Sequence, residues 1–155
     1  MYNSGAKQYQ RVNVTSEVLD ADPHRLIQLL MEAALTRMSQ AKGAIERNDM
    51  PTKANLLGRV TEILGTLQAS LNFQQGGDVA NNLERLYEYM TRRLLEATSR
   101  NDVAMIDEVM GLLLDVKQGW DGIRQEYLDS AHPQRNASSS SASSAETVGM
   151  ASVSA

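Results

Sequence analysis

Apolar side chains recur every three or four residues along four stretches of the chain, and short polar breaks separate these stretches. This spacing lines one face of an α-helix. The first stretch begins after Asp22-Pro23, where the aspartate can cap free backbone amides and the proline supplies a preset φ at the first helical position. It continues through Leu26 and Leu30 to Ile45. The pattern predicts a long amphipathic helix that starts at this proline.

The second stretch has similar boundaries. It follows Asp49 and Pro51, an acidic cap and an early proline, and its apolar residues extend to Leu71. Gly76-Gly77 is expected to stop the helix, because glycine readily adopts a positive φ. Asp78 is then expected to cap a third helix.

The third stretch runs from Val79 to Ala97, and Asn101-Asp102 turns the chain into a fourth stretch that reaches Tyr127. Connections of only a few residues make each helix run antiparallel to the one before it. Aromatic residues at 5% and only 3 prolines favour helices over a β-sandwich or barrel. The sequence therefore predicts an all-α fold, an antiparallel up-down-up-down four-helix bundle.

The bundle is predicted to span residues 22–128. Residues 1–21 carry scattered apolar side chains, so this N-terminal segment is expected to pack onto the bundle as a cap. Residues 129–155 are rich in Ser and Ala and have too little apolar surface to offset the entropy of ordering, so this tail is predicted to be disordered. No apolar run approaches the roughly 20 residues of a membrane span, and the start lacks a secretory signal. We expect a soluble, cytoplasmic chain without membrane insertion.

Few residues could carry chemistry. The chain has no cysteine and only two histidines. His24 falls in a first helical turn and His132 in the tail, and both are interpreted as capping or solvated residues. A di-metal bundle needs histidines and carboxylates that converge from several helices, and a net charge of -4 argues against nucleic acid. We therefore predict no catalytic residue, no cofactor and no metal, and a protein that works by binding another protein.

Two predicted helices have apolar stripes wider than one neighbour requires. In the fourth helix, Met105, Leu112 and Ile123 lie to one side of the core face. Leu114 lies to the other side. This width indicates either a groove for another chain or a central helix that contacts two neighbours. The second helix has doubled apolar positions, and its sequence leaves the same two interpretations open.

The third helix offers two surface candidates. Tyr89 lies about 200° from Tyr87 around the helix, so only one of them can point into the core, and Tyr89 is the surface residue. The Arg92-Arg93 pair could bind an acidic partner. A charge pair on a helix is more often a solvated face, or pairs with acids such as Glu88 and Glu96.

Several blocks of the chain occur together in one known family. They are Met1-Tyr2, Tyr9 with Val12 and Val14, Asp22-Pro23-His24, Gln75-Gly76-Gly77-Asp78, the stretch from Asn82 to Ala97 that contains Leu86-Tyr87-x-Tyr89-Met90-x-Arg92-Arg93, Asn101-Asp102, and Gly111-Leu112-Leu113 to Trp120. In order and spacing this chain resembles the flagellin export chaperone family FliS over residues 1 to 127.

The resemblance implies a cytosolic chaperone that binds the disordered C-terminal segment of flagellin, prevents premature polymerisation and assists delivery to the flagellar type III export gate. It also implies that the N-terminal segment occupies part of the binding surface when no client is present. The candidate partner-binding residues are Tyr9, Val12, Val14, Leu57, Val60, Leu64, Leu67, Leu71, Tyr89, Arg93, Met105, Leu112, Val116 and Ile123. The alternative is a regulatory or structural bundle that self-associates, for example as a homodimer, without chaperone activity.

Overall fold

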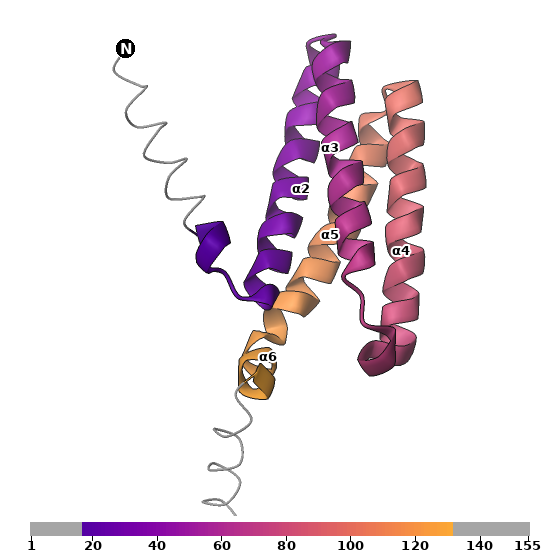
Figure 1. The fold of residues 1–155 in the computed structure, drawn as a ribbon. Coiled ribbons are helices and arrows are strands. Elements are labelled where there is room, and N and C mark those ends of the chain that lie inside the picture. Colours follow the sequence, from indigo (N-terminus) through magenta and orange to yellow (C-terminus); the bar gives the residue numbers. More distant parts are fainter. Residues whose placement is uncertain (1–16, 132–155) are drawn as a thin grey trace, which may run out of the picture. The chain divides into compact units, whose positions relative to one another are not determined.

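The computed structural model describes residues 17–131. A short helical stretch, residues 17–20, precedes the helices labelled in Figure 1. These are α2 (Pro23–Glu46), α3 (Met50–Ala69), α4 (Phe73–Arg100), α5 (Val103–Gly122) and α6 (Arg124–Ala131). The chain divides into two compact units, one up to Gln118 and one from Gly119 onward. The predictions for Tyr9, Val12 and Val14 lie outside the described residues, as does the predicted tail from residue 132 onward, whereas residues 129–131 belong to α6.

The first two helices begin where their caps were predicted. The Asp22 carboxylate accepts a hydrogen bond from the Arg25 amide at 2.8 Å, and Pro23 occupies the first helical turn. The Asp49 carboxylate accepts one from the Thr52 amide at 3.3 Å, and its bonds with Thr52 lower the pKa of Asp49. Each aspartate thus satisfies an amide that has no partner within the helix.

The boundary between α3 and α4 differs from the prediction. Helix α3 ends at Ala69, and Asn72 accepts hydrogen bonds from the amides of Gln74 and Gln75, so α4 begins before the glycines. Gly77 does adopt a positive φ, of 49°, but it forms a kink inside α4 rather than a helix stop. The predicted end of the second helix at the glycines was wrong, because α3 already ends at Ala69, and Asn72 caps a short helical turn before the break that Gly77 makes.

This kink makes Gly77 sensitive to substitution. Its φ of 49° and ψ of -122° fall where a Cβ atom is strained. Gly77→Ala is expected to lower the free energy of unfolding by roughly 1–3 kcal/mol in urea titrations. Gly58→Ala is the matched control, because a Cβ there meets open space inside a helix and should stabilise by up to about 1 kcal/mol. Equal effects of the two substitutions would contradict the strain at Gly77.

The predicted fourth helix is broken near its end. Helix α5 ends at Gly122, Ile123 lies in a turn, and α6 follows. The Ile123 amide donates to the Trp120 carbonyl at 3.3 Å, a tighter turn than an α-helix has. Gly119 and Gly122 each disfavour helix by about 1 kcal/mol relative to alanine, which explains why the apolar pattern continues through Tyr127 while the helix does not.

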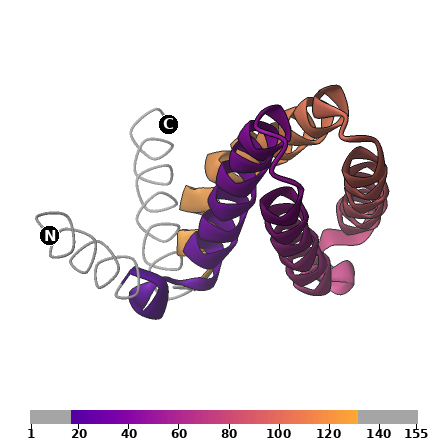
Figure 2. The ribbon, with the colours of Figure 1, turned by 90° about the horizontal axis from the view of Figure 1, so that it is seen from above.

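Helices α2 to α4 and the part of α5 up to Gln118 form the predicted antiparallel bundle. Figures 1 and 2 show α3 between α2 and α4, with α5 across the bundle from α3. Polar contacts across the bundle fix the antiparallel directions. Lys42, late in α2, contacts Asp107, early in α5. Glu32, earlier in α2, contacts Lys117, later in α5. The fold class is therefore confirmed.

Each helix buries one apolar stripe in a shared core. Met38, Leu64, Met90 and Val109, one from each helix, are completely buried. His24 is also completely buried. The prediction of a solvated His24 was wrong, because this position in the first turn of α2 faces the interior.

A lysine joins α3 to the end of α4. Lys53 is buried, and its Nζ donates to the Thr98 carbonyl at 2.9 Å and to Asn101 Oδ1 at 2.6 Å. Carbonyl groups in the last turn of a helix have no partner within the helix, and a cation there also suits the helix dipole. Lys53 therefore caps α4 from a neighbouring helix, a role that the sequence pattern did not indicate.

Candidate partner-binding surface

Four of the predicted partner-binding residues belong to the core. Leu57, Val60, Leu64 and Leu67 of α3 are at most 2% exposed. They point into the interior of the bundle, so they do not line an open surface in this structure. Their assignment to the surface is corrected for this reason: they form the centre of the buried stripe of α3.

Their neighbours in sequence are placed differently. Leu56 and Ile63 flank the buried stripe of α3 and are half-buried. The side of α3 that faces α4 is marked by the Gln68 amide, which donates to Glu88 at 3.4 Å. Leu56 and Ile63 lie on the other side of the stripe by their helical positions, which is the side of α2.

Helix α2 contributes apolar residues to the same seam. Leu26 is 36% exposed, and Ala33 is half-buried. They lie on the side of α2 away from Glu32 and Lys42, the residues that contact α5. Together with Leu56 and Ile63 they form what we call the α2–α3 strip. The sequence pattern assigned these positions to the core stripe.

The α2–α3 strip differs from the seams that involve α5. Ion pairs join α2 to α5 and α4 to α5. Among the described residues, no ion pair joins α2 to α3, although these two helices pack closely. The seam between α2 and α3 is therefore held by apolar contacts, and part of its aliphatic surface faces outward.

The remaining predicted residues are dispersed. Leu71 is half-buried in the link before α4, and Met105 is buried at the start of α5. Leu112 and Val116 are half-buried on α5. Ile123 is 42% exposed and belongs to the second unit. The structure thus does not gather these residues into one surface.

Tyr89 and Arg93 lie on the seam between α4 and α5, as part of a polar cluster. The Tyr89 hydroxyl donates to Glu108 of α5, and Arg93 Nη2 lies 2.8 Å from Glu108 Oε2. Arg93 Nη1 also contacts Glu96 at 3.2 Å. Tyr89 is half-buried, while burial of Tyr87 raises its pKa to about 12. The prediction that Tyr87 is the core tyrosine and Tyr89 the surface one is confirmed.

This cluster predicts a pH dependence. The Tyr89 hydroxyl, and then Arg93, lower the pKa of Glu108 below its ordinary value of 4.5. A carboxylate whose pKa is lower when folded stabilises the fold above its unfolded pKa, and this contribution is lost as pH falls through the folded pKa. Glu108→Gln is therefore expected to flatten the loss of stability below pH 4.5, measured by urea unfolding at several pH values. Glu62→Gln, an exposed carboxylate on α3, is the control. Identical acid profiles of wild type and Glu108→Gln would contradict the prediction.

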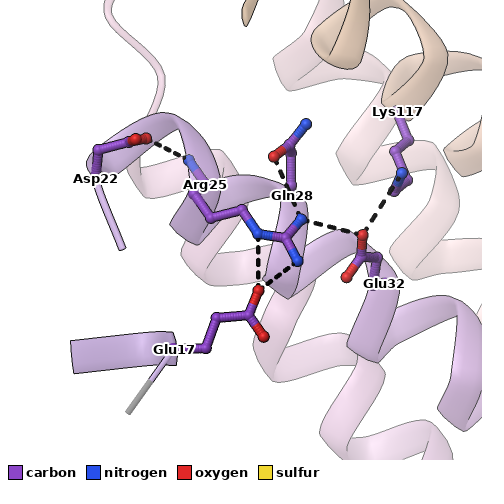
Figure 3. A network of polar contacts seen from close by, with 6 residues as sticks. All are labelled: Glu17, Asp22, Arg25, Gln28, Glu32 and Lys117. Atoms are coloured by element: carbon purple, nitrogen blue, oxygen red, sulfur yellow. Dashed lines mark hydrogen bonds and ion pairs between the residues drawn. The ribbon is translucent and has the colours of Figure 1, made fainter. Parts of the chain in front are cut away.

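A second polar network holds the stretch before α2, as Figure 3 shows. Arg25 Nη2 lies 2.6 Å from Glu17 Oε1, and its Nη1 lies 3.3 Å from Glu32 Oε1. Glu32 also contacts Lys117 of α5 at 3.7 Å. The bond to Glu17 raises the pKa of Arg25. Arg25 therefore connects the residues that precede α2 with both α2 and α5.

No cluster of three or more His, Cys, Asp or Glu side chains suited to a metal ion occurs within residues 17–131. In the same range, no helix is long and apolar enough to cross a membrane. The described part of the chain thus consists of helices joined by apolar seams and by ion pairs.

The sequence matches the model of the family described as "Flagellar protein FliS" over residues 5–127. The chain belongs to the FliS family. Flagellar secretion chaperone FliSB of Pseudomonas aeruginosa is 54% identical over 117 residues, which cover 76% of this chain and 93% of that protein. Flagellar secretion chaperone FliS of Salmonella typhimurium is 41% identical over 118 residues (76% and 87%). The Vibrio cholerae FliS is 36% identical over 119 residues (77% and 88%).

A solved structure supports the fold of this FliS family member. The crystal structure of a flagellar chaperone from bacteria covers 78% of this chain and 98% of its own, with a TM-score of 0.63. The sequence identity is 16%, so this similarity concerns the fold alone. The family expected from the sequence is confirmed by the family match and the relatives.

Proposed function

We propose that this chain is a cytoplasmic flagellar secretion chaperone that binds the C-terminal segment of flagellin, prevents premature polymerisation and assists delivery to the flagellar type III export apparatus. The names of its relatives, flagellar secretion chaperones, support this role. The structural observation that carries it is the α2–α3 strip, where Leu26 and Ile63 keep aliphatic surface outward after the helices have packed.

The proposed mechanism is coupled folding and binding. A disordered client segment gains helical structure and buries its apolar side chains against the α2–α3 strip, at the expense of chain entropy. Because those client side chains would otherwise contact other flagellin subunits, their burial suppresses assembly. The chaperone acts by occupancy and needs no covalent step.

Tyr9, Val12 and Val14 keep a role in this proposal. The N-terminal segment that contains them competes with the client for the binding surface and is displaced when flagellin binds. Leu112 and Val116 of α5 are proposed to extend the contact beyond α2 and α3, as are Tyr89 and Arg93 of α4.

Isothermal titration calorimetry of the full chain with a flagellin C-terminal peptide tests the proposal. We expect saturable binding with a negative heat-capacity change, the signature of buried apolar surface. A peptide whose leucines and isoleucines are replaced by serine is the control and should not bind. If the native peptide also fails to bind while the chain forms stable dimers, the self-associating bundle without chaperone activity is the better description.

A further inference from the structure

Two arginines lie along the α2–α3 strip. Arg37 of α2 follows Ala33 by four residues, so both lie on the same side of their helix. Arg59 of α3 lies three residues after Leu56 and four before Ile63, which places it at the outer edge of the strip. Arg37 is half-buried and Arg59 is exposed. The strip therefore carries two positive charges beside its aliphatic side chains.

The two arginines are at the same level of the bundle. Arg37 lies nine residues before Glu46, the last residue of α2. Arg59 lies nine residues after Met50, the first residue of α3. Because the turn between these antiparallel helices is short and both rise about 1.5 Å per residue, equal distances from the turn give equal levels. Packed helices are about 8–10 Å apart, so two guanidinium groups on this side repel each other and attract an anion together.

Neither charge is neutralised by a carboxylate of residues 17–131. The lysines and the arginine at the seams with α5 each contact a carboxylate, whereas no ion pair in this range involves Arg37 or Arg59. Arg37 Nη1 donates to the Ala33 carbonyl at 3.4 Å. A guanidinium group has five N–H donors, so both arginines keep donors that can bind a carboxylate through two parallel hydrogen bonds.

The N-terminal segment of the chain lacks the matching charge. Residues 1–16 include Lys7 and Arg11 and contain no Asp or Glu. Under the proposed function, this segment occupies the binding surface when no client is present. A segment of this composition can cover aliphatic side chains, but the two arginines repel its positive charges. A ligand that carries a carboxylate has the complementary charge.

We infer that Arg37 and Arg59 select client segments in which a side-chain carboxylate lies between two groups of apolar residues. The strip continues past the arginines toward Leu56 in one direction and toward Ile63 in the other, so a side chain within the segment fits this level better than a chain terminus does. The inference rests on the proposed function and adds a charge requirement to it. This requirement favours the client over the chain's own N-terminal segment.

Isothermal titration calorimetry of four combinations tests this selection. The proteins are the full chain and its Arg37→Gln/Arg59→Gln variant. The ligands are the flagellin C-terminal peptide and a neutral form in which every Asp and Glu is replaced by Asn or Gln. Wild type should bind the neutral peptide roughly tenfold more weakly than the native one, whereas the variant should bind both alike.

The outcomes separate this inference from the proposed function. If wild type binds both peptides equally, or if the variant still prefers the native peptide, the inference is overturned and the chaperone function stands. If wild type binds neither peptide, both are overturned. The comparison of the two peptides on wild type needs no variant, so it decides the question even if the variant folds poorly.

Two controls establish where the effect originates. Arg85→Gln removes an exposed arginine of α4 that has no ion pair within residues 17–131, and it should keep the wild-type preference. The native peptide with an amidated C-terminus should bind wild type unchanged. A tenfold loss on amidation would assign the arginines to a chain terminus and overturn the inference. Urea titration should show the Arg37→Gln/Arg59→Gln variant to be as stable as wild type, because glutamine has a similar helix propensity.

Discussion

Replacing Leu64 with aspartate is expected to unfold the bundle. This leucine is completely buried in the middle of α3. Removing most of its side chain, as in Leu64→Ala, should lower the free energy of unfolding by about 2–5 kcal/mol through lost apolar burial and a residual cavity. Aspartate adds the cost of a carboxylate without a partner in an apolar site. Because domains of this size are stable by only about 5–15 kcal/mol, the aspartate variant should have little folded population.

Far-UV circular dichroism and urea titration would measure both variants. The alanine variant should retain helical signal with an earlier urea midpoint, and the aspartate variant should lose cooperative unfolding. A folded Leu64→Asp chain of near wild-type stability would show that this side chain reaches solvent, and would restore Leu64 as a surface residue.

Replacing the adjacent Ile63 with aspartate should leave the bundle folded but weaken the binding of the client peptide. Ile63 is half-buried in the α2–α3 strip, so the bundle can fold around a carboxylate that reaches water. Binding of the flagellin peptide should nevertheless weaken roughly 10- to 100-fold, because the bound peptide would exclude water from a carboxylate that has no partner in the apolar contact.

The measurement is the peptide titration, combined with a urea titration of each variant. Asn55→Asp is the matched control, because it adds the same charge at an exposed position of α3 outside the strip. A folded Ile63→Asp variant that binds the peptide as tightly as Asn55→Asp would remove the α2–α3 strip from the proposed client surface.

The contrast between Leu64 and Ile63 shows which features of the surface could be predicted from the sequence and which could not. Periodicity locates an apolar face, and the doubled positions Leu56-Leu57 and Ile63-Leu64 both fit it. Which member of each pair is buried depends on where the neighbouring helices lie, since a rotation of α3 by a fraction of a turn exchanges them. The second member is buried in both pairs. The predicted surface therefore included core residues and omitted half-buried ones.

Helix boundaries were predictable where a side chain and a proline gave the same signal. Asp22 and Asp49 cap α2 and α3 as expected. The start of α4 depends instead on Asn72, six residues before Asp78, which the sequence had offered as the cap. The role of Lys53 could not be read from the sequence, because its acceptors at Thr98 and Asn101 are brought near it only by the packing of α3 against α4.

The absence of ion pairs between α2 and α3 among the described residues has a consequence for client choice. Directional bonds select a fixed alignment of donors and acceptors, whereas aliphatic contacts tolerate small sliding movements at little cost. Helix α3 is tied to α4 at Lys53, so a visiting segment can widen the α2 side without breaking a charged contact. Under the proposed function, this would let the chain bind client segments that differ in sequence but keep apolar residues at helical spacing.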